Sequence, residues 1–164
     1  MSSTDDLLAH NAQFAAGFDA AGAPGRPARK VAVLACMDAR LDPARALGLE
    51  PGDAHVIRNA GGVVTEDAIR SLVISQRLLG TEEIVLIHHT GCGMLSFSDK
   101  AVLDQIEYEV GTRPDFALRS FQFLDQDVRE SIAALQANPF LPHRDSIRGF
   151  VYDIETGALR EVSR

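Results

Sequence analysis

Two short apolar runs, each followed at once by reactive side chains, dominate the pattern of hydrophobic and polar positions. The first covers residues 31–35 and the second covers residues 83–87. Short runs rich in valine and isoleucine are typical of strands buried on both faces, as in a parallel sheet covered by helices. Another run at 54–57 and a loosely alternating one at 147–154 predict two further strands, the last as an edge strand or hairpin.

Helical patterns separate these strands. Asp42 followed by Pro43 predicts a short helix that stops at Gly48, and Thr65 predicts the start of a longer helix that Gly80 ends. Two further helices are predicted at about residues 100–110 and 124–137. Strands that alternate with helices imply right-handed crossovers. The pattern therefore predicts an α/β fold: a mostly parallel central sheet, helices on both faces and a final antiparallel edge strand or hairpin.

The N-terminal residues 1–21 have apolar positions at a rough helical spacing. We interpret them as a helical arm, either clasping a partner subunit or packing on its own domain, and the sequence favours neither reading. A segment rich in glycine and proline at 22–27 separates the arm from the first strand. We expect residues 1–164 to form a single domain.

Composition narrows the choice of partners and compartment. The 164 residues include 16 basic and 23 acidic ones, for a formal charge of −7, and no basic stripe is present. A nucleic-acid partner is therefore not expected. No apolar run approaches the roughly 18 residues of a membrane span, and the start lacks the features of a secretory signal. We expect a cytoplasmic protein without a membrane partner.

Cys36 directly follows the first apolar run, and Cys92 lies a few residues after the second. Thiols stay reduced in the cytoplasm, so a metal site is favoured over a disulfide. Catalytic zinc typically takes three protein ligands and keeps a fourth position open. The two cysteines and one histidine would supply such a set, and either His88 or His89 could reach the metal. Cys36, Asp38 and Arg40 stand two residues apart. If the two-residue period of the strand continued beyond Ala35, their side chains would lie on the same side of the chain.

The sequence of residues 36–40, Cys-Met-Asp-Ala-Arg, resembles the Cys-x-Asp-x-Arg motif of the β-class carbonic anhydrases. His-Thr-Gly-Cys-Gly at 89–93 resembles the family's His-x-x-Cys-Gly segment. Residues 51–53 and 58–61 resemble its Pro-Gly-Asp and Arg-Asn-Ala-Gly connection. Order and spacing match over about residues 31–97, and the flanks resemble the family in outline, as in its small bacterial branch.

The resemblance implies one Zn²⁺ per chain held by Cys36, His89 and Cys92, with His88 as a neighbour that is not a ligand. It makes Asp38 and Arg40 the catalytic dyad. The implied reaction is attack of zinc-bound hydroxide on carbon dioxide to give bicarbonate, and the implied assembly is a homodimer or a larger homo-oligomer. An apolar gas needs an apolar pocket, whose candidate wall residues are Met37, Val63, Val64, Met94, Leu95 and Phe97.

Two alternatives stay open at this stage. The same zinc hydroxide would attack carbonyl sulfide or carbon disulfide, and hydrolases of these molecules occur in the same small bacterial branch. A structural zinc, or a disulfide between Cys36 and Cys92, would merely join two strand ends. The chain also departs from many relatives, because Arg26-Pro27-Ala28 lacks the glutamine of their Gln-x-Pro segment and no tryptophan is present.

Overall fold

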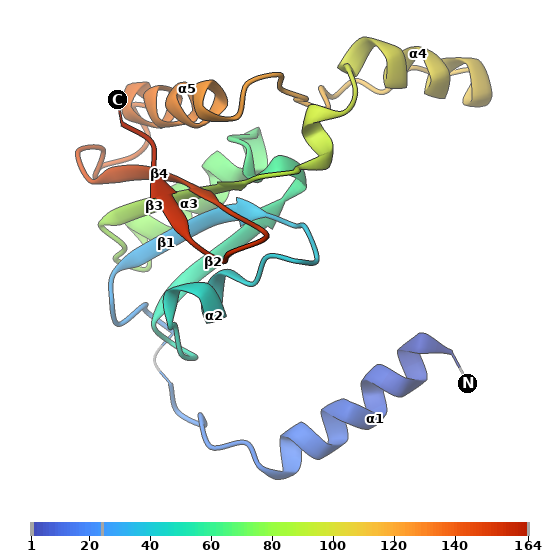
Figure 1. The fold of residues 1–164 in the computed structure, drawn as a ribbon. Coiled ribbons are helices and arrows are strands. Elements are labelled where there is room, and N and C mark those ends of the chain that lie inside the picture. The colour runs from blue at the N-terminus through green and yellow to red at the C-terminus, as the bar shows by residue number, and fades with distance from the viewer. Residues whose placement is uncertain (1, 24, 164) are drawn as a thin grey trace.

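The computed structural model describes residues 2–23 and 25–163, which build a five-stranded sheet with strand order β2-β1-β3-β4-β5 (Figure 1). The first four strands are parallel, and β5 pairs antiparallel with β4. The strands are β1 Val31–Cys36, β2 Ala54–Asn59, β3 Glu83–His89, β4 Ile147–Tyr152 and β5 Leu159–Glu161. The predicted mostly parallel α/β sheet with a terminal hairpin is confirmed.

Helices cover the two faces of the sheet unequally. The long helices α3 (Glu66–Arg77) and α5 (Leu124–Ala137) pack on one face, where they bury a cluster centred on Leu34 and Leu86. The other face has the short helix α2 (Pro43–Leu47) together with two 3₁₀ turns, Ala60–Gly62 and Gly93–Leu95. Because that cover is thinner, loops from the strand ends reach the buried apolar cluster on this side.

The predicted helix boundaries follow from local hydrogen bonds. Asp42 caps α2 by accepting from the Arg45 N–H, and Thr65 caps α3 by accepting from the Ala68 N–H. Beyond α3, Gly80 has a φ of 77°, and the Thr81 N–H bonds back to the carbonyl of Ser75. This hydrogen bond is one residue longer than the six-to-one bond of a Schellman motif, and α3 itself ends at Arg77 with Leu78 as its C-cap, so Gly80 turns the chain just beyond the helix.

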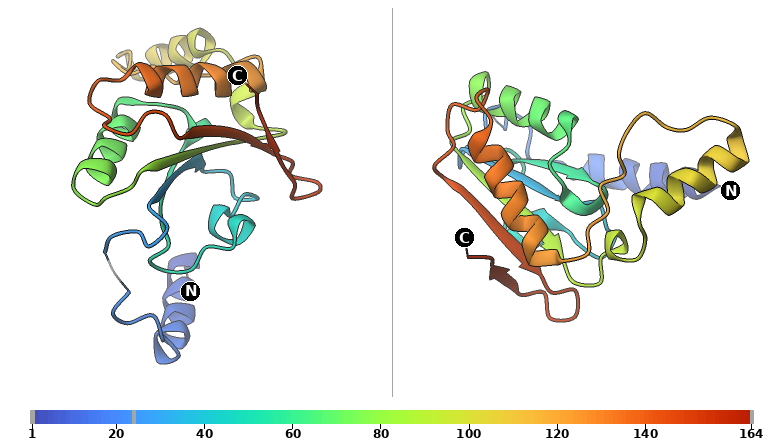
Figure 2. Two further views of the ribbon diagram at one scale, coloured as in Figure 1. Left: turned by 90° about the vertical axis from the view of Figure 1, so that its left-hand side faces the viewer. Right: turned by 90° about the horizontal axis from the view of Figure 1, so that it is seen from above.

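Two helices extend away from the sheet (Figure 2). Helix α1 (Ser3–Ala16) begins with a capping box between Ser2 and Asp5 and has no buried residue. Helix α4 (Asp99–Val110) buries only Leu103. The reading in which the N-terminal arm packs on its own domain therefore does not describe α1. None of the helices in the described ranges has the length and apolar character that crossing a membrane requires.

The sheet brings three loops to one edge. Cys36 at the end of β1 pairs in register with Asn59 at the end of β2, and Ala35 pairs with Ile87 near the end of β3. Ligand sites in open parallel sheets lie outside the carboxyl ends of the strands. The segments after β1, β2 and β3 therefore share the edge where a site is expected.

Candidate metal centre

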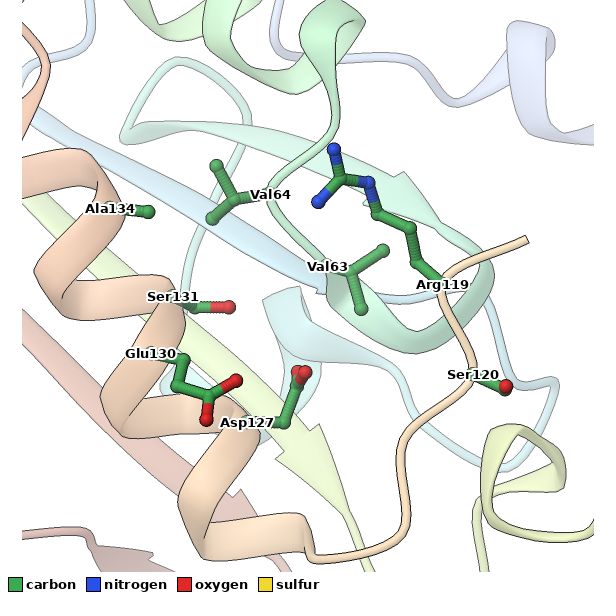
Figure 3. A pocket seen from close by; sticks show the side chains of 8 residues that line it. All are labelled: Val63, Val64, Arg119, Ser120, Asp127, Glu130, Ser131 and Ala134. Atoms are coloured by element: carbon green, nitrogen blue, oxygen red, sulfur yellow. The ribbon is translucent and has the colours of Figure 1, made fainter. Parts of the chain in front are cut away.

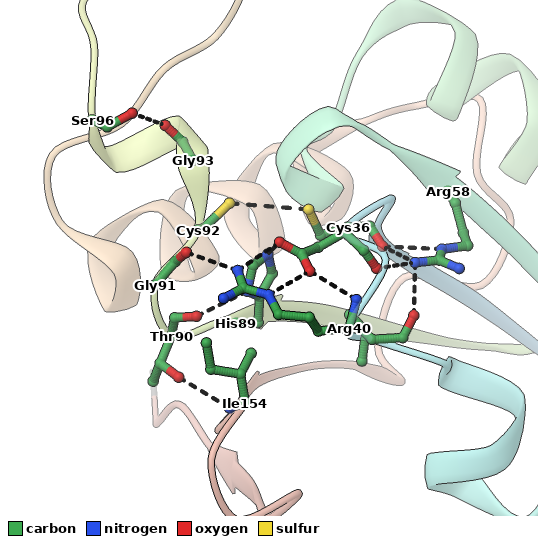
Figure 4. A network of polar contacts seen from close by, with 12 residues as sticks. Cys36, Arg40, Arg58, His89, Thr90, Gly91, Cys92, Gly93, Ser96 and Ile154 are labelled. Atoms are coloured by element: carbon green, nitrogen blue, oxygen red, sulfur yellow. Dashed lines mark hydrogen bonds and ion pairs between the residues drawn. The ribbon is translucent and has the colours of Figure 1, made fainter.

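The structure brings the three predicted ligand residues, Cys36, His89 and Cys92, to one point (Figure 4). All three are buried, and one potential ligand atom from each lies within 4.8 Å of the others. The two sulfur atoms are 4.0 Å apart. Two thiolates bound to a tetrahedral zinc at its usual bond length are separated by about 3.8 Å. The spacing of the sulfur atoms thus fits a metal ion between them.

The imidazole of His89 presents a bare nitrogen to this cluster. Its Nδ1 lies 2.9 Å from the carbonyl oxygen of Thr90, and a carbonyl only accepts, so Nδ1 carries the proton. In the neutral ring Nε2 then holds a lone pair. Nε2 is buried and has no hydrogen-bond partner among the described residues. A buried, unpaired acceptor is costly. His88 Nδ1 is also buried and unpaired, but only the His89 ring belongs to the cluster with the two sulfur atoms, where a cation could complete its bonding.

The two thiols share a hydrogen bond, which lowers the pKa of Cys36 and raises the pKa of Cys92. The cause is electrostatic, because a second negative charge on Cys92 would lie beside the first on Cys36. A divalent cation would neutralise both thiolates. The donor set is therefore chemically suited to a metal as well as spaced for one.

His88 belongs to a different environment. Successive strand residues point to opposite faces of a sheet, and His88 faces α5, where its Nε2 donates to the Asp127 carboxylate at 2.6 Å. The ring is fully buried and packs 5.3 Å from Phe121 between centroids. This pair was not predicted from the sequence, because 39 residues separate its members and no spacing rule connects them.

Asp38 and Arg40 form a two-point ion pair beside the cluster. Arg40 Nε donates to Oδ1 at 2.9 Å and the terminal nitrogen NH2 donates to Oδ2 at 2.8 Å. Arg40 NH2 also donates to the carbonyl oxygen of Gly91. The hydrogen bonds from Arg40 hold the pKa of Asp38 well below its usual range. Oδ2 lies 3.6 Å from His89 Nε2, so an ionised carboxylate faces the bare nitrogen.

The side chains of Asp38 and Arg40 lie close together, as expected, but for a different structural reason. The prediction assumed a strand period that continues past Ala35, but β1 ends at Cys36. The chain then turns, with the Leu41 N–H bonded to the carbonyl of Asp38 and the Arg40 N–H bonded to the Asp38 carboxylate. A turn, rather than an extended strand, folds the guanidinium back onto the carboxylate.

A cavity of about 360 Å³ lies against the ligand cluster. Of the predicted wall residues, Met37, Met94 and Phe97 line it, with Cys36, Asp38, Ala60, Gly61, Cys92, Gly93 and Ser96. The prediction was wrong for Val63 and Val64, which line a second cavity, and for Leu95, which packs against the core. The positive φ of Gly61 and Gly62 turns the chain before Val63, whose side chain packs in the same buried apolar cluster as Cys36 and Cys92 without lining the cavity.

The second cavity, of about 280 Å³, lies between α5 and the loop that carries Arg119 (Figure 3). Asp127 and Glu130 on α5 line one side, and Val63 and Val64 line the base. None of the three ligand residues of the cluster lines this cavity. It therefore adds nothing to the metal centre.

Gly62 brings the backbone after β2 into close contact with the central strands. A Cβ atom on Gly62 would lie 2.8 Å from the amide nitrogen of Cys36, 2.9 Å from the carbonyl oxygen of Ile87 and 3.0 Å from the carbonyl carbon of Ala35. All three contacts are with main-chain atoms of β1 and β3. The glycine thus allows the turn after β2 to lie directly on the strand ends that carry the site.

Substitution of this glycine should test the contact. We expect Gly62→Ala to lower the free energy of unfolding by about 3 kcal/mol, through crowding against main chain added to the strain of a positive φ. Gly48→Ala is the matched control, because Gly48 also has a positive φ, of 63°, but a Cβ atom there would have no neighbour within 4 Å. It should cost about 1 kcal/mol. Urea denaturation measures both, and equal losses would show that crowding at Gly62 contributes nothing.

Fold and cluster together define a class: a parallel α/β protein with a buried Cys-His-Cys set that fits a metal ion at the carboxyl ends of its strands. The family model for carbonic anhydrase matches residues 31–159. Together with relatives of the β class, this match shows that the chain belongs to the β-carbonic anhydrase family.

The relatives cover nearly the whole chain. Beta-carbonic anhydrase 1 of Mycobacterium tuberculosis is 52% identical over 163 residues, which is 99% of each chain. The solved carbonic anhydrase of Streptococcus mutans is 43% identical, covers 99% of both chains and superposes with a TM-score of 0.93. A carbon disulfide hydrolase of Acidithiobacillus thiooxidans is 40% identical over 80% of this chain and 76% of its own. The family thus contains relatives named for two different substrates.

Proposed function

We propose that this chain is a zinc-dependent carbonic anhydrase that interconverts carbon dioxide and bicarbonate, with one Zn²⁺ held by Cys36, His89 and Cys92. One observation carries the proposal. Two thiols and an imidazole nitrogen that lacks a proton converge in a buried site beside an ionised carboxylate. Three such ligands leave a fourth position of a tetrahedral metal open, which is the arrangement of catalytic rather than structural zinc.

Asp38 and Arg40 position the attacking group of the proposed reaction. When bound, zinc lowers the pKa of water from 15.7 towards about 7 and so provides hydroxide near neutral pH. Asp38 would accept a hydrogen bond from that hydroxide and so orient its lone pair towards the substrate carbon. Arg40 donates to both oxygens of Asp38, which keeps the carboxylate ionised and holds it off the metal position.

The cavity over the cluster suits a small apolar substrate. The thioether of Met94 and the ring of Phe97 line it beside the two cysteines, and Asp38 supplies its charged side chain. Small-molecule sites typically combine mostly apolar walls with a few placed polar groups that fix the orientation of the ligand. This composition supports carbon dioxide as substrate.

Stopped-flow hydration of carbon dioxide by the zinc-loaded protein tests the proposal. We expect fast turnover that rises with pH between about 6 and 9, because the deprotonated form of the attacking water is the active one. Asp38 does not contribute to this rise, since its lowered pKa keeps it ionised over the whole range. A flat pH profile would contradict the role given to the metal, and no turnover would contradict the function.

A carbon disulfide hydrolase is the second candidate, supported by relatives of that name at 40% and 35% identity. Only the shape of the cavity would separate the two linear substrates. The identity of 52% over the full chain to a relative named for carbonic anhydrase favours the first candidate. Sulfide release from carbon disulfide, measured on the same preparation, distinguishes them.

We also propose a homodimer or a larger homo-oligomer in which α1 clasps a neighbouring subunit. The proposal rests on exposed apolar side chains of the arm, Leu7, Leu8, Phe14 and Phe18, and on the absence of any buried residue in α1. Solved relatives from Sordaria macrospora are described as tetrameric. The proposed compartment is the reducing cytoplasm, since the ligand set needs both thiols free. A light-scattering mass of one chain would contradict the clasp.

A further inference from the structure

We propose that Arg58 is a positioning residue for Asp38, acting as a clamp on the main chain of the loop between β1 and α2. The inference rests on the proposed function, because it assigns a role in that reaction. Arg58 lies at the end of β2, on a different strand from the catalytic dyad. Its guanidinium binds the loop through main-chain oxygens, so any effect on catalysis must pass through the loop.

The guanidinium of Arg58 gathers three carbonyl oxygens. Nε and the terminal nitrogen NH2 donate to the carbonyl of Cys36 at 3.0 and 2.9 Å. The same NH2 group donates to the carbonyl of Asp38 at 2.8 Å and to that of Leu41 at 2.7 Å (Figure 4). One planar fork of donors therefore ties the end of β1 to both ends of the turn that carries the dyad.

These carbonyls need a donor at that position. Three carbonyl oxygens that converge on one point repel one another unless a cationic donor lies between them, and unpaired main-chain oxygens are costly. The other restraints on the turn each hold a single main-chain group or act through Arg40. Its main chain is also held by the Met37 N–H on the carbonyl of Asn59, by the Leu41 N–H on the carbonyl of Asp38 and by the Arg40 N–H on the Asp38 carboxylate, and the Arg40 side chain bonds to the carbonyl of Gly91. Arg58 is thus a principal restraint on the path of the loop.

The clamp fixes Asp38 through its main chain, on the opposite end of the residue from the carboxylate. Arg58 binds the main-chain carbonyl of Asp38, while Arg40 binds its carboxylate, so two guanidinium groups hold the two ends of one residue. If the main chain shifts, the carboxylate moves relative to His89 Nε2, which it now faces at 3.6 Å. Misplacement of a catalytic group by about 1 Å typically costs about 10²-fold in rate. Cys36 is less affected, because β1 is paired on both sides.

The test compares Arg58→Gln and Arg58→Lys with Arg77→Gln. Arg77 is the matched control, since it also donates to a main-chain carbonyl, that of Phe140, and neither residue lies in the loops that carry the site. We expect Arg58→Gln to lower kcat for carbon dioxide hydration by about 10- to 100-fold with full zinc content. Arg58→Lys should recover only part, since a point donor cannot span three oxygens. Arg77→Gln should match the unchanged protein.

A double-mutant cycle with Asp38→Asn separates positioning from general damage. If Arg58 acts through Asp38, adding Arg58→Gln to Asp38→Asn should lower kcat by less than about 2-fold. Losses that simply multiply would overturn the inference, because Arg58 would then act independently of Asp38. Loss of zinc from Arg58→Gln would also overturn it, since the effect would pass through Cys36.

A second measurement needs no activity. In the metal-free protein, amide hydrogen exchange at Arg40 and Leu41 should be about 10-fold faster in Arg58→Gln, because both amides bond to Asp38 in the clamped turn. The amide of Val33, in the middle of β1, should be unchanged. Unchanged exchange at Arg40 and Leu41 would overturn the clamp. Faster exchange in a protein that never hydrates carbon dioxide would support the clamp and refute the proposed function alone.

Discussion

Replacing His89 with glutamine is expected to remove the metal and to lower the rate of carbon dioxide hydration by at least about 10³-fold. The imidazole is one of only three protein ligands in the proposed set, and two thiolates alone leave a metal weakly held. Enzymes accelerate their reactions by about 10⁶-fold or more in total, and in the proposed reaction the metal supplies the nucleophile, so its loss should remove most of the catalysis. Metal content after dialysis and stopped-flow rates measure the two effects.

His88→Gln is the matched control for this substitution. The glutamine amide can still donate to Asp127, as the His88 N–H does, and the ligand cluster is left intact. We expect a full metal content and a rate within a few-fold of the unchanged protein. If His88→Gln lost the metal and His89→Gln kept it, the assignment of the ligand would be reversed.

Asp38→Asn is expected to keep the metal and still lower kcat by about 10²- to 10³-fold. The amide cannot accept a hydrogen bond with the strength of a carboxylate, and its NH₂ group faces Arg40 with like donors. Because Asp38 is not one of the three clustered ligands, metal content should stay full. Stopped-flow kinetics with a zinc assay on the same sample tests both statements.

The control for Asp38→Asn is Asp67→Asn. Asp67 also pairs with an arginine close in sequence, through Oδ1 and Arg70 Nε at 2.8 Å, but the pair lies exposed on α3. Exposed ion pairs contribute little to stability, so this variant should keep its full rate. Full activity of Asp38→Asn would show that the carboxylate is not catalytic.

Much of the architecture was readable from the sequence because its causes are local. A side-chain cap at Asp42, a valine-rich run before Cys36 and a glycine after α3 each act within a few residues. The same holds for the ligand residues, which directly or closely follow apolar strands. Parallel pairing then brings the strand ends together by topology alone.

The contacts that could not be predicted depend on main-chain atoms or on distant packing. Arg58 binds carbonyl oxygens, which every residue has, so no pattern of side chains marks its targets. The pair of His88 and Asp127 forms only once α5 packs on the sheet. The wrong placement of Val63 and Val64 in the substrate pocket has the same origin, because the turn before them is a tertiary arrangement.

The imidazole of His89 owes its orientation to the carbonyl of its own chain neighbour, Thr90, rather than to another side chain. A point mutation can delete a carboxylate that supports a histidine, but it cannot delete a peptide carbonyl. Substitutions at other positions therefore leave this hydrogen bond of His89 in place as long as the main-chain path is preserved. Asp38 has no such protection, because its carboxylate depends on the side chain of Arg40. A single substitution, of Arg40, can therefore disturb the orientation of Asp38, whereas the hydrogen bond that orients His89 is lost only if the main chain itself moves.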